Sequence, residues 1–523
     1  MLLSRTTLLA AVSLTAASSL SAVELAPLFV DNAVLQRGKE VAVWGKGKPG
    51  EKISVQFAGQ DKSATVDAAG LWSVKLDGLT AAKDGRELTV KGDTTIVLKD
   101  VLVGEVWICS GQSNMEMTVG RTLDAANEIA AANLPTIRQV KVPTTNSATP
   151  VTSLKLTWVA ASPKTAGDFT AAGFYFAREV AKALDVPVGL ISSNWGGTRI
   201  EPWTNAAGFH SVPELKSIAD QVDSWDPTTE LGSKAHLEFL TKLKAWIPLA
   251  ETAATARQAV PPMPQAPVPG VDQQQPTKLW NGMINPLVPY GIRGALWYQG
   301  EANGGEGPSY TQKMQALVGC WRQAFGQGEF PFYFVQLANW QTSDPAQPQG
   351  GDGWSRVREA QRAALAAIPH TGMAVTIDIG EGGDIHPKNK QEVGHRLAQW
   401  ALANDYAQPV ESSGPLFKAQ AIEGATIRVS FDHADAGLMV GSKKGLKPTE
   451  EVKDGALTWW AIAGEDKVWK KAVAKIDGAT VVVSSPDVAK PVAVRYAFAM
   501  NPDGCNLYNK VGLPASPFRT DTW

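Results

Sequence analysis

The sequence predicts an α/β protein with a largely parallel sheet, flanked by an N-terminal and a C-terminal β-sandwich region. Short strand-like runs of alternating polarity fill residues 23–100 and return over residues 409–523. Between them, over residues 101–408, buried apolar strands alternate with amphipathic helices. The 523 residues also exceed one ordinary domain, since single cores stop growing at roughly 300 residues.

The first 22 residues have the pattern of a secretory signal. Arg5 precedes an apolar, alanine-rich run over Leu8–Ala17, and small residues follow up to Ala22. We expect a signal peptide over residues 1–22, cleaved between Ser19 and Ala22, and therefore a secreted or periplasmic protein. No later segment has about 18 uninterrupted apolar residues, so no membrane span is expected.

The N-terminal region begins the β pattern. The runs Val41–Trp44, Ile53–Phe57 and Trp72–Leu76 alternate in polarity, and turns with Gly and Asp separate them. This pattern predicts a small antiparallel β-sandwich. A second one is predicted from residue 409 onward, with strands such as Thr426–Phe431 and Val492–Tyr496.

The central region reads as strands followed by helices. Val101–Cys109 is a nearly continuous apolar run, typical of a strand buried on both faces. Ala171–Leu184 has apolar residues at helical spacing and leads directly into the strand Val186–Ser192. The same reading gives strands at Ile292–Tyr298, Phe332–Leu337 and Met373–Asp378, and helices at Trp354–Ala367 and Lys388–Asn404. Such alternation predicts a parallel sheet covered on both faces.

One insertion interrupts this region at about residues 205–278. Residues 206–257 are predicted to be helical and polar, and residues 260–276 contain six prolines, which favour an extended segment. We expect the insertion to form a lid or a rim.

Composition narrows the class of partner. The 49 basic and 51 acidic residues nearly cancel and form no charge run, so neither nucleic acid nor an anionic membrane is expected as a partner. Cys109, Cys320 and Cys505 lack metal-type spacing, and no metal or cofactor is expected. Eighteen Trp residues mildly favour a carbohydrate partner, because Trp rings stack on sugars, although most are expected in the core. The oligomeric state is not indicated.

Ser113 is the first candidate for chemistry. It stands in Gly111-Gln-Ser-Asn-Met115, after a buried strand and before a helix. Ligands of open α/β sheets bind beyond the carboxyl ends of strands, and the start of a helix offers N–H groups for an oxyanion. The lipase-type Gly-x-Ser-x-Gly is absent, because Met115 takes the place of its last Gly. Ser113 is therefore either a nucleophile or a helix N-cap.

The base is sought among six histidines. His386 lies in a glycine-rich loop after the strand that ends at Asp378, which places it at the same sheet edge as Ser113. Asp384, two residues earlier, can accept from the imidazole and hold its tautomer.

Two more strand-end loops carry possible oxyanion donors. The loop Asn194–Thr198 offers the backbone N–H of Gly197, and Gln299–Asn303 offers the side-chain amide of Gln299 or Asn303. Removing one such donor typically costs about 3 kcal/mol of transition-state stabilisation. The side chains expected to meet a substrate beside these loops are Trp195, Arg199, Glu201 and Glu301.

These motifs resemble the sialate O-acetylesterase family, SGNH/GDSL-like hydrolases that include carbohydrate acetylesterases. The segments that carry the resemblance are Gly111–Met115, Trp195–Thr198, Trp297–Asn303, Asp384–Pro387 and the C-terminal Asn506–Thr520. It implies an SGNH-type three-layer fold and an O-acetylated carbohydrate as substrate. It also implies Ser113 as nucleophile, His386 and Asp384 as the other triad members, and Gly197 with Gln299 or Asn303 as oxyanion donors.

The sequence departs from the broader SGNH pattern in two places. That pattern has Asp three residues before His, where this chain has Gly383, so Asp378, Glu381 or a Ser–His dyad remain open. Its third block is Gly-x-Asn-Asp, whereas Asn303 is three residues after Gly300, which leaves Gln299 and Asn303 both open.

Three further alternatives stay open. The scaffold could serve a lipase or thioesterase, or a non-catalytic carbohydrate-binding protein. Within the acetylesterases, sialic acid would favour an Arg such as Arg199 in the site, whereas neutral xylan, xyloglucan or mannan would favour a Trp-lined cleft.

Overall fold

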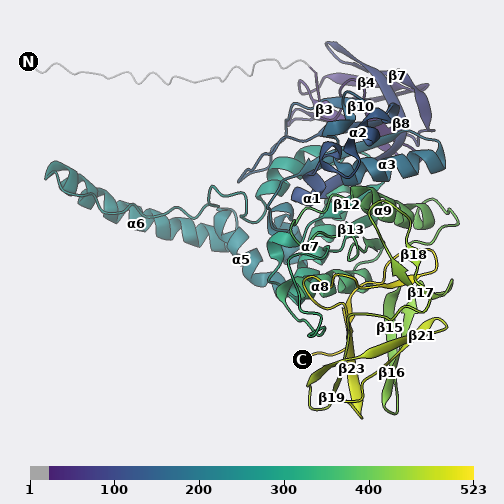
Figure 1. Cartoon of the computed structure of the whole chain (residues 1–523). Helices are drawn as coiled ribbons and strands as arrows, with labels where there is room; N and C mark the ends of the chain where they lie inside the picture. The colour runs from purple at the N-terminus through teal and green to yellow at the C-terminus, as the bar shows by residue number, and fades with distance from the viewer. Residues whose placement is uncertain (1–22) are drawn as a thin grey trace, which may run out of the picture.

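The structure is a computed structural model that describes residues 23–523, so the signal peptide expected at residues 1–22 lies outside the described residues. It is a mixed α/β protein with one large mixed sheet and several smaller β-sheets (Figure 1). The α/β class expected from the sequence is confirmed at this level. Among the described residues, no helix is long and apolar enough to cross a membrane.

Six parallel strands form the centre of the large sheet, in the order β9-β11-β8-β12-β13-β14. Their bounds are Leu134–Lys141, Val188–Asn194, Thr95–Gly111, Gly294–Tyr298, Phe332–Val335 and Thr371–Ala374, and β10 (Trp158–Ala161) pairs antiparallel with β9 at the edge. Gly111 at the end of β8 pairs with Asn194 of β11 and Tyr298 of β12. Three loops therefore begin at one row of the sheet.

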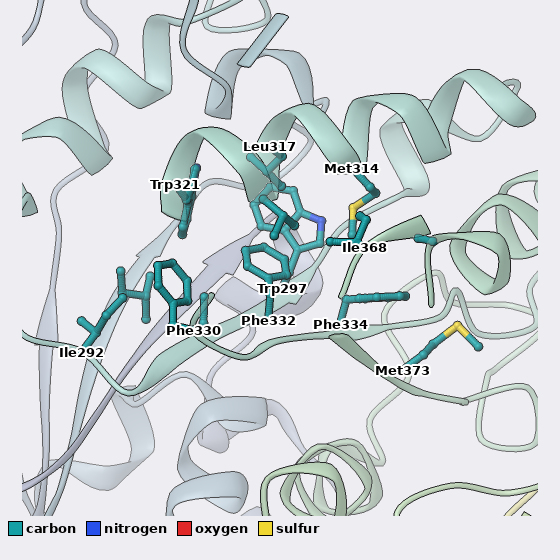
Figure 2. Close-up of a cluster of buried hydrophobic side chains, with 14 of the residues drawn as sticks. Ile292, Trp297, Met314, Leu317, Trp321, Phe330, Phe332, Phe334, Ile368 and Met373 are labelled. Atoms are coloured by element: carbon teal, nitrogen blue, oxygen red, sulfur yellow. The ribbon is translucent and has the colours of Figure 1, made fainter. Parts of the chain in front are cut away.

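Helices cover both faces of this sheet. Helices α3 (Ala171–Leu184) and α9 (Lys390–Asn404) share a core with Leu296 and Tyr298, whereas α7 (Pro308–Phe325) and α8 (Gly353–Ala367) share one with Trp297. Figure 2 shows Trp297, Phe332 and Phe334 from the sheet packed beneath Met314, Leu317 and Trp321 of α7. Burying such a side chain contributes about 2–3 kcal/mol, so these contacts hold the strands that carry the site.

The helix α7 is absent from the sequence prediction. Its signals are Pro308 at the first turn, apolar residues at helical spacing, and Gly326 after its last residue, with φ +65°. The strand β9 is absent from the sequence prediction as well, and the short helix α2 covers Ala125–Ala130.

The strand β8 is continuous across residue 100, where the sequence changes from runs of alternating polarity to a nearly continuous apolar run. Its first half pairs antiparallel with β7 (Ala82–Lys91) and its second half pairs with β11 and β12. Residues 95–100 are mostly exposed, while Val101–Gly111 are all buried. The change in sequence pattern is thus a change of burial within one strand. That strand joins the N-terminal β region to the large sheet.

The remaining N-terminal strands are short. The strands β1 (Glu24–Leu25), β3 (Val41–Lys46) and β6 (Leu71–Leu76) form a separate three-stranded sheet. Of the others, β2 (Val34–Gln36) pairs with β8, β4 (Lys52–Phe57) pairs with β7, and β5 (Gln60–Thr65) pairs with β4. They extend the large sheet at the end remote from the strand-end loops.

The insertion contains α4 (Ala206–His210), α5 (Lys216–Trp225) and α6 (Glu230–Thr255). Helix α6 projects away from the body of the molecule (Figure 1), and Gly232 is its one buried residue. The chain returns beside it, since Trp246 donates from its indole to the carbonyl of Pro261 at 2.9 Å. Gln274 then reaches the strand-end loops, where its amide donates to the Gly197 carbonyl at 2.7 Å.

The C-terminal region has two four-stranded antiparallel sheets. One is β15 (Leu416–Glu423), β16 (Thr426–Asp432), β22 (Thr480–Ser484) and β21 (Val473–Asp477); the other is β20 (Trp469–Lys471), β19 (Trp460–Gly464), β23 (Pro491–Tyr496) and β25 (Phe518–Arg519). A smaller sheet contains β17 (Leu438–Ser442), β18 (Glu450–Glu451) and β24 (Leu507–Asn509).

Arg358 of α8 ties this region to the large sheet. Its buried guanidinium donates to the carbonyls of Leu337 and Ala338 after β13, each at 2.8 Å. It also donates to Ala499 at 2.6 Å and Met500 at 2.7 Å, both beyond β23. Four buried carbonyls from two regions therefore share one side chain.

Candidate active site

Ser113 is the first residue of the short helix α1 (Ser113–Glu116), directly beyond the end of β8. Gln112 occupies the N-cap position and its side chain makes no capping bond. The alternative that Ser113 serves as the helix cap therefore does not describe this structure. Its hydroxyl is half-buried and lies 2.9 Å from Nε2 of His386.

Asp384 completes a row of three side chains. One of its carboxylate oxygens lies 3.4 Å from Nδ1 of His386 and accepts the backbone N–H of His386 at 2.9 Å. This backbone hydrogen bond and the nearby imidazole lower the pKa of the Asp384 carboxyl below its usual value. The order hydroxyl, imidazole, carboxylate is the one that an activated serine requires.

The other two carboxylates that the sequence left open as partners of His386 bind different groups. Asp378 forms a bidentate ion pair with Arg396, at 2.6 and 2.8 Å, and both side chains are buried. Glu381 accepts the backbone N–H of Lys388 at 2.8 Å. Of the three, Asp384 is the carboxylate that faces His386.

Two glycines lie beside the nucleophile. A methyl group on Gly196 would approach Cβ of Ser113 to 3.3 Å, and the Gly196 N–H is already donated to Glu116 at 2.8 Å. Gly197 has φ +72° and is exposed, and its N–H has no hydrogen-bond partner among residues 23–523. Gly197 thus offers an unpaired backbone donor one residue after Gly196, which lies beside Ser113.

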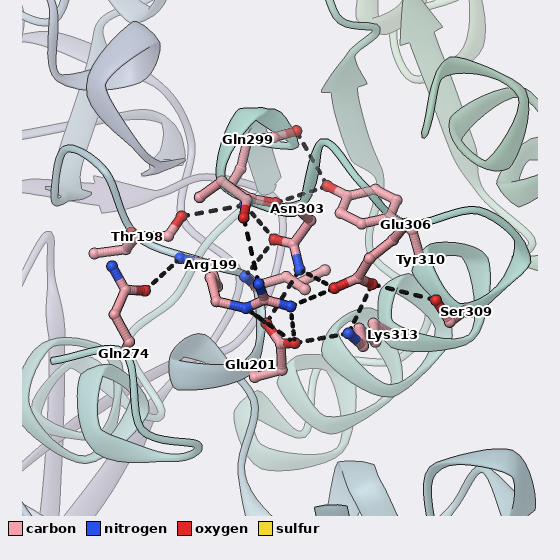
Figure 3. A network of polar contacts seen from close by, with 12 residues as sticks. Thr198, Arg199, Glu201, Gln274, Gln299, Asn303, Glu306, Ser309, Tyr310 and Lys313 are labelled. Atoms are coloured by element: carbon pink, nitrogen blue, oxygen red, sulfur yellow. Dashed lines mark hydrogen bonds and ion pairs between the residues drawn. The ribbon is translucent and has the colours of Figure 1, made fainter. Parts of the chain in front are cut away.

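Gln299 and Asn303 form part of a buried polar network instead (Figure 3). The Gln299 amide donates to the Thr198 carbonyl at 3.1 Å and to Oδ1 of Asn303 at 2.7 Å. The Asn303 amide donates to Glu201 at 3.2 Å and Glu306 at 2.9 Å. This differs from the expected oxyanion role, because every amide N–H of the two side chains is already donated to a buried acceptor.

The charged part of the network balances two cations against two carboxylates. Arg199 pairs with Glu201 at 3.0 Å and with Glu306, and Lys313 pairs with the same two carboxylates at 2.6 and 2.7 Å. Burial alone would raise the pKa of Glu201, but the hydrogen bonds from Arg199 and the charge of Lys313 lower it to about 2. Glu201 is consequently a buried partner and not the substrate contact that the sequence suggested, whereas Arg199 is partly exposed.

The last two expected substrate contacts lie close to α1. The backbone N–H of Trp195 donates to the Gly111 carbonyl at 3.1 Å, and its ring is half-buried against the core. Glu301 accepts the Asn114 amide at 2.5 Å through one oxygen, and burial raises the pKa of its carboxyl. Among residues 23–523, no cluster of three or more His, Cys, Asp or Glu side chains is arranged to hold a metal ion.

Sequence reasoning missed Asn114 and Lys390. Lys390 is fully buried and donates to the Asn114 side chain at 2.7 Å. The available signals were an amide inside the Gly111–Met115 motif and a lysine three residues after Pro387, but neither residue type by itself indicates burial.

Comparison with known proteins places the chain in a family. The profile described as "Carbohydrate esterase, sialic acid-specific acetylesterase" matches residues 103–221 and 273–403. The sialate O-acetylesterase of Mus musculus is 30% identical over 448 residues, covering 75% of this chain and 75% of that protein. The chain belongs to the sialate O-acetylesterase family. It is accordingly a carboxylic ester hydrolase.

Other members of the sialate O-acetylesterase family agree in extent. The Homo sapiens sialate O-acetylesterase is 30% identical over 426 residues, covering 74% of this chain and 72% of that protein. A solved carbohydrate acetylesterase from Xanthomonas citri is 36% identical, with a TM-score of 0.78, and covers 96% of this chain and 100% of that chain. The resemblance read from the motifs is thereby confirmed. Residues 222–272, which include α6, lie outside the matched family segments.

Proposed function

We propose that the protein is a secreted or periplasmic serine esterase that removes O-acetyl groups from carbohydrates through an acetyl-enzyme. The observation that carries this proposal is the 2.9 Å contact between Ser113 Oγ and His386 Nε2, backed by Asp384 on the opposite nitrogen. The α/β region, with helices on both faces of a parallel sheet, supports an assignment to the SGNH-type three-layer folds.

The mechanism has two acyl-transfer steps. His386 removes the proton of Ser113 as its oxygen attacks the acetyl carbonyl, and a tetrahedral oxyanion forms. The ester C–O bond then breaks, and His386 returns the proton to the departing sugar oxygen. Water, deprotonated by His386, attacks the acetyl-Ser113 carbonyl, and acetate leaves as Ser113 recovers its proton.

The oxyanion is held by backbone donors in this proposal. The unpartnered N–H of Gly197 is one donor. The backbone N–H groups of Ser113 and Asn114, at the start of α1, are the others, because neither has a hydrogen-bond partner among residues 23–523. Gln299 and Asn303 support these donors indirectly. The Gln299 amide donates to the Thr198 carbonyl, and the Asn303 side chain accepts the Ile200 N–H, so both hold the end of the loop that contains Gly197.

The substrate class follows from the family and from the charges beside Ser113. Sialate O-acetylesterases and a carbohydrate acetylesterase are the relatives, so both acetylated sialic acid and acetylated plant glycans are substrates to test. Arg199 is already paired with Glu201 and Glu306, which supports a neutral acetylated glycan more than an acidic sugar.

The decisive experiment measures acetate release from O-acetylated sialic acid and from acetylated xylan or xyloglucan, side by side. We expect Ser113→Ala to lose about 10³-fold or more of kcat on the preferred substrate. Ser110→Ala is the matched control, since the buried Ser110 hydroxyl in β8 has no hydrogen-bond partner among the described residues and its removal should leave activity intact.

Two results would contradict the proposal. A Ser113→Ala variant with full activity would remove Ser113 from the reaction. Hydrolysis of long-chain acyl esters as efficient as that of acetyl esters would instead favour the lipase or thioesterase alternative.

A further inference from the structure

The nucleophile and the base are 273 residues apart in the sequence and come from different loops. One hydrogen bond between two half-buried side chains does little to fix their relative position, because each side chain can rotate. Other contacts between the Ser113 segment and the His386 segment therefore matter for the alignment of the two side chains.

Asn114, the residue after Ser113, reaches the His386 loop. Its buried amide donates to the carbonyl of Ile385 at 3.0 Å and to Glu301 at 2.5 Å. The Ile385 carbonyl belongs to the peptide immediately before His386. A side chain of the nucleophile helix thus holds the peptide that precedes the base.

Lys390, the first residue of α9, binds the carbonyl of the residue on the other side of His386. Its fully buried amine donates to the Pro387 carbonyl at 2.6 Å and to Oδ1 of Asn114 at 2.7 Å. Both carbonyls that flank His386 are therefore bound, one by Asn114 and one by Lys390, and the two side chains bind each other.

We propose that Lys390 and Asn114 together are a positioning device that fixes His386 relative to Ser113. This inference rests on the proposed serine mechanism and adds to it two side chains, those of Asn114 and Lys390, that touch neither the substrate nor the reacting atoms. A displacement of about 1 Å in a catalytic group can lower a rate about 100-fold, which sets the scale of the expected effect.

The device does not depend on the charge of Lys390. The Asn114 and Pro387 oxygens that Lys390 binds need two N–H groups, and a neutral amine supplies both. An ammonium group has a third N–H, and the Tyr298 ring lies 5.2 Å from the Lys390 nitrogen. Burial lowers the pKa of Lys390 to about 7. The charges of Glu301, Glu381 and Asp384 act to raise this pKa, and the charge of Arg121 acts to lower it. A positioning role therefore predicts a loss of rate at every pH with the pH profile unchanged in shape.

The test compares Lys390→Met with Lys388→Met, an exposed lysine two residues earlier. For Lys390→Met we expect kcat to fall about 10- to 100-fold, with KM for acetylated xylan or a small acetyl ester changed less than about 3-fold. The rate of Ser113 phosphonylation by a small organophosphonate should fall by a similar factor. Lys388→Met should match the wild type in both.

Two further variants keep the test decisive. Lys390→Gln retains an N–H donor and should recover part of the lost kcat, which guards against a folding defect in Lys390→Met. Because Asn114 and Lys390 bind each other while they hold the same loop, the loss of kcat in the double variant Asn114→Leu with Lys390→Met should be smaller than the product of the two single losses. Additive losses in the double variant would overturn the coupling.

Unchanged kcat and phosphonylation in Lys390→Met would overturn the inference while leaving Ser113 as the nucleophile. A shifted pH profile would instead assign Lys390 an electrostatic role. Full activity in Ser113→Ala would reject the underlying serine mechanism, so the two failures are distinguishable.

Discussion

Gly197 shows how one backbone conformation can carry chemistry. Its φ of +72° lies in the left-handed region that residues with a Cβ rarely adopt, although a methyl group there would meet no atom within 4 Å. The position is strained for alanine without being crowded. Its N–H has no hydrogen-bond partner among the described residues.

We predict that Gly197→Ala lowers kcat/KM at least about 10-fold, because relief of the left-handed strain turns this N–H away from the oxyanion. Gly326→Ala is the matched control: Gly326 has φ +65°, equally open surroundings, and lies at the end of α7. Both variants should lose about 1 kcal/mol of unfolding free energy, measured in urea. Equal kcat/KM in the two variants would remove Gly197 from the oxyanion site.

The Glu201 carboxylate ties part of the stability of the fold to pH. Its pKa of about 2 is below its value in an unfolded chain, so its ionised form stabilises the fold above about pH 4. That stabilisation is lost as the pH falls from about 4 toward 2, where Glu201 becomes protonated in the folded state.

Lys313→Met should therefore lower the unfolding free energy by about 3 kcal/mol at pH 7, since the buried Glu201 loses one of its cations. The deficit relative to the wild type should shrink between pH 4 and pH 3. Urea unfolding at pH 7, 5, 4 and 3 measures it, with the exposed Lys242→Met as control. A deficit that is the same at pH 3 as at pH 7 would contradict this assignment.

The sequence located the candidate residues better than it assigned their roles. Ser113, His386 and Asp384 all follow recognisable patterns, and the structure brings them together. Local sequence could not exclude Asp378, because its partner Arg396 lies 18 residues away and only the fold places the two in contact. The same holds for Gln299 and Asn303, whose amides donate to Thr198 and Glu201, 101 and 102 residues earlier in the chain.

At the scale of elements, periodicity succeeded where one face of a segment is apolar. The helix expected over Ala171–Leu184 is α3 with the same bounds, and the strand expected over Ile292–Tyr298 is β12, two residues shorter. Helix α7 was missed although it covers one face of the sheet, because its polar residues interrupt an otherwise regular apolar spacing. Burial of α7 depends in part on Trp203, whose carbonyl accepts the indole N–H of Trp321 across 118 residues of sequence.

Helix α6 differs from α7 in burial, since it is long and yet has a single buried residue. Most helical stability in proteins comes from packing an apolar face, and isolated helices are marginal in water. The Thr229 cap, which accepts the Gly232 N–H at 2.9 Å, and the Trp246–Pro261 contact are what hold it locally.

We predict that backbone amides of α6 exchange with solvent at least about 100-fold faster than those of α3. Local opening of α6 exposes little new apolar surface, whereas α3 has eight buried residues. Hydrogen exchange followed by mass spectrometry compares the two helices within one molecule. Equal protection in α6 and α3 would show that another contact covers α6 in solution.

At the scale of the whole molecule, two features connect regions that the sequence presents as separate. The strand β8 passes from the N-terminal β region into the large sheet, and Arg358 joins the sheet to the C-terminal region. The expected boundary near residue 100 coincides with a real change in burial. Because pairing partners lie far apart in sequence, continuity of β8 could not be read from local patterns.

The projecting α6 also affects how the molecule moves through solvent. At 1.5 Å per residue its 26 residues span about 39 Å, which is more than the radius of a compact domain of several hundred residues. Such an appendage adds drag far out of proportion to its mass. The protein should therefore sediment more slowly than a sphere of 55.7 kDa and scatter X-rays with a long tail in its distance distribution.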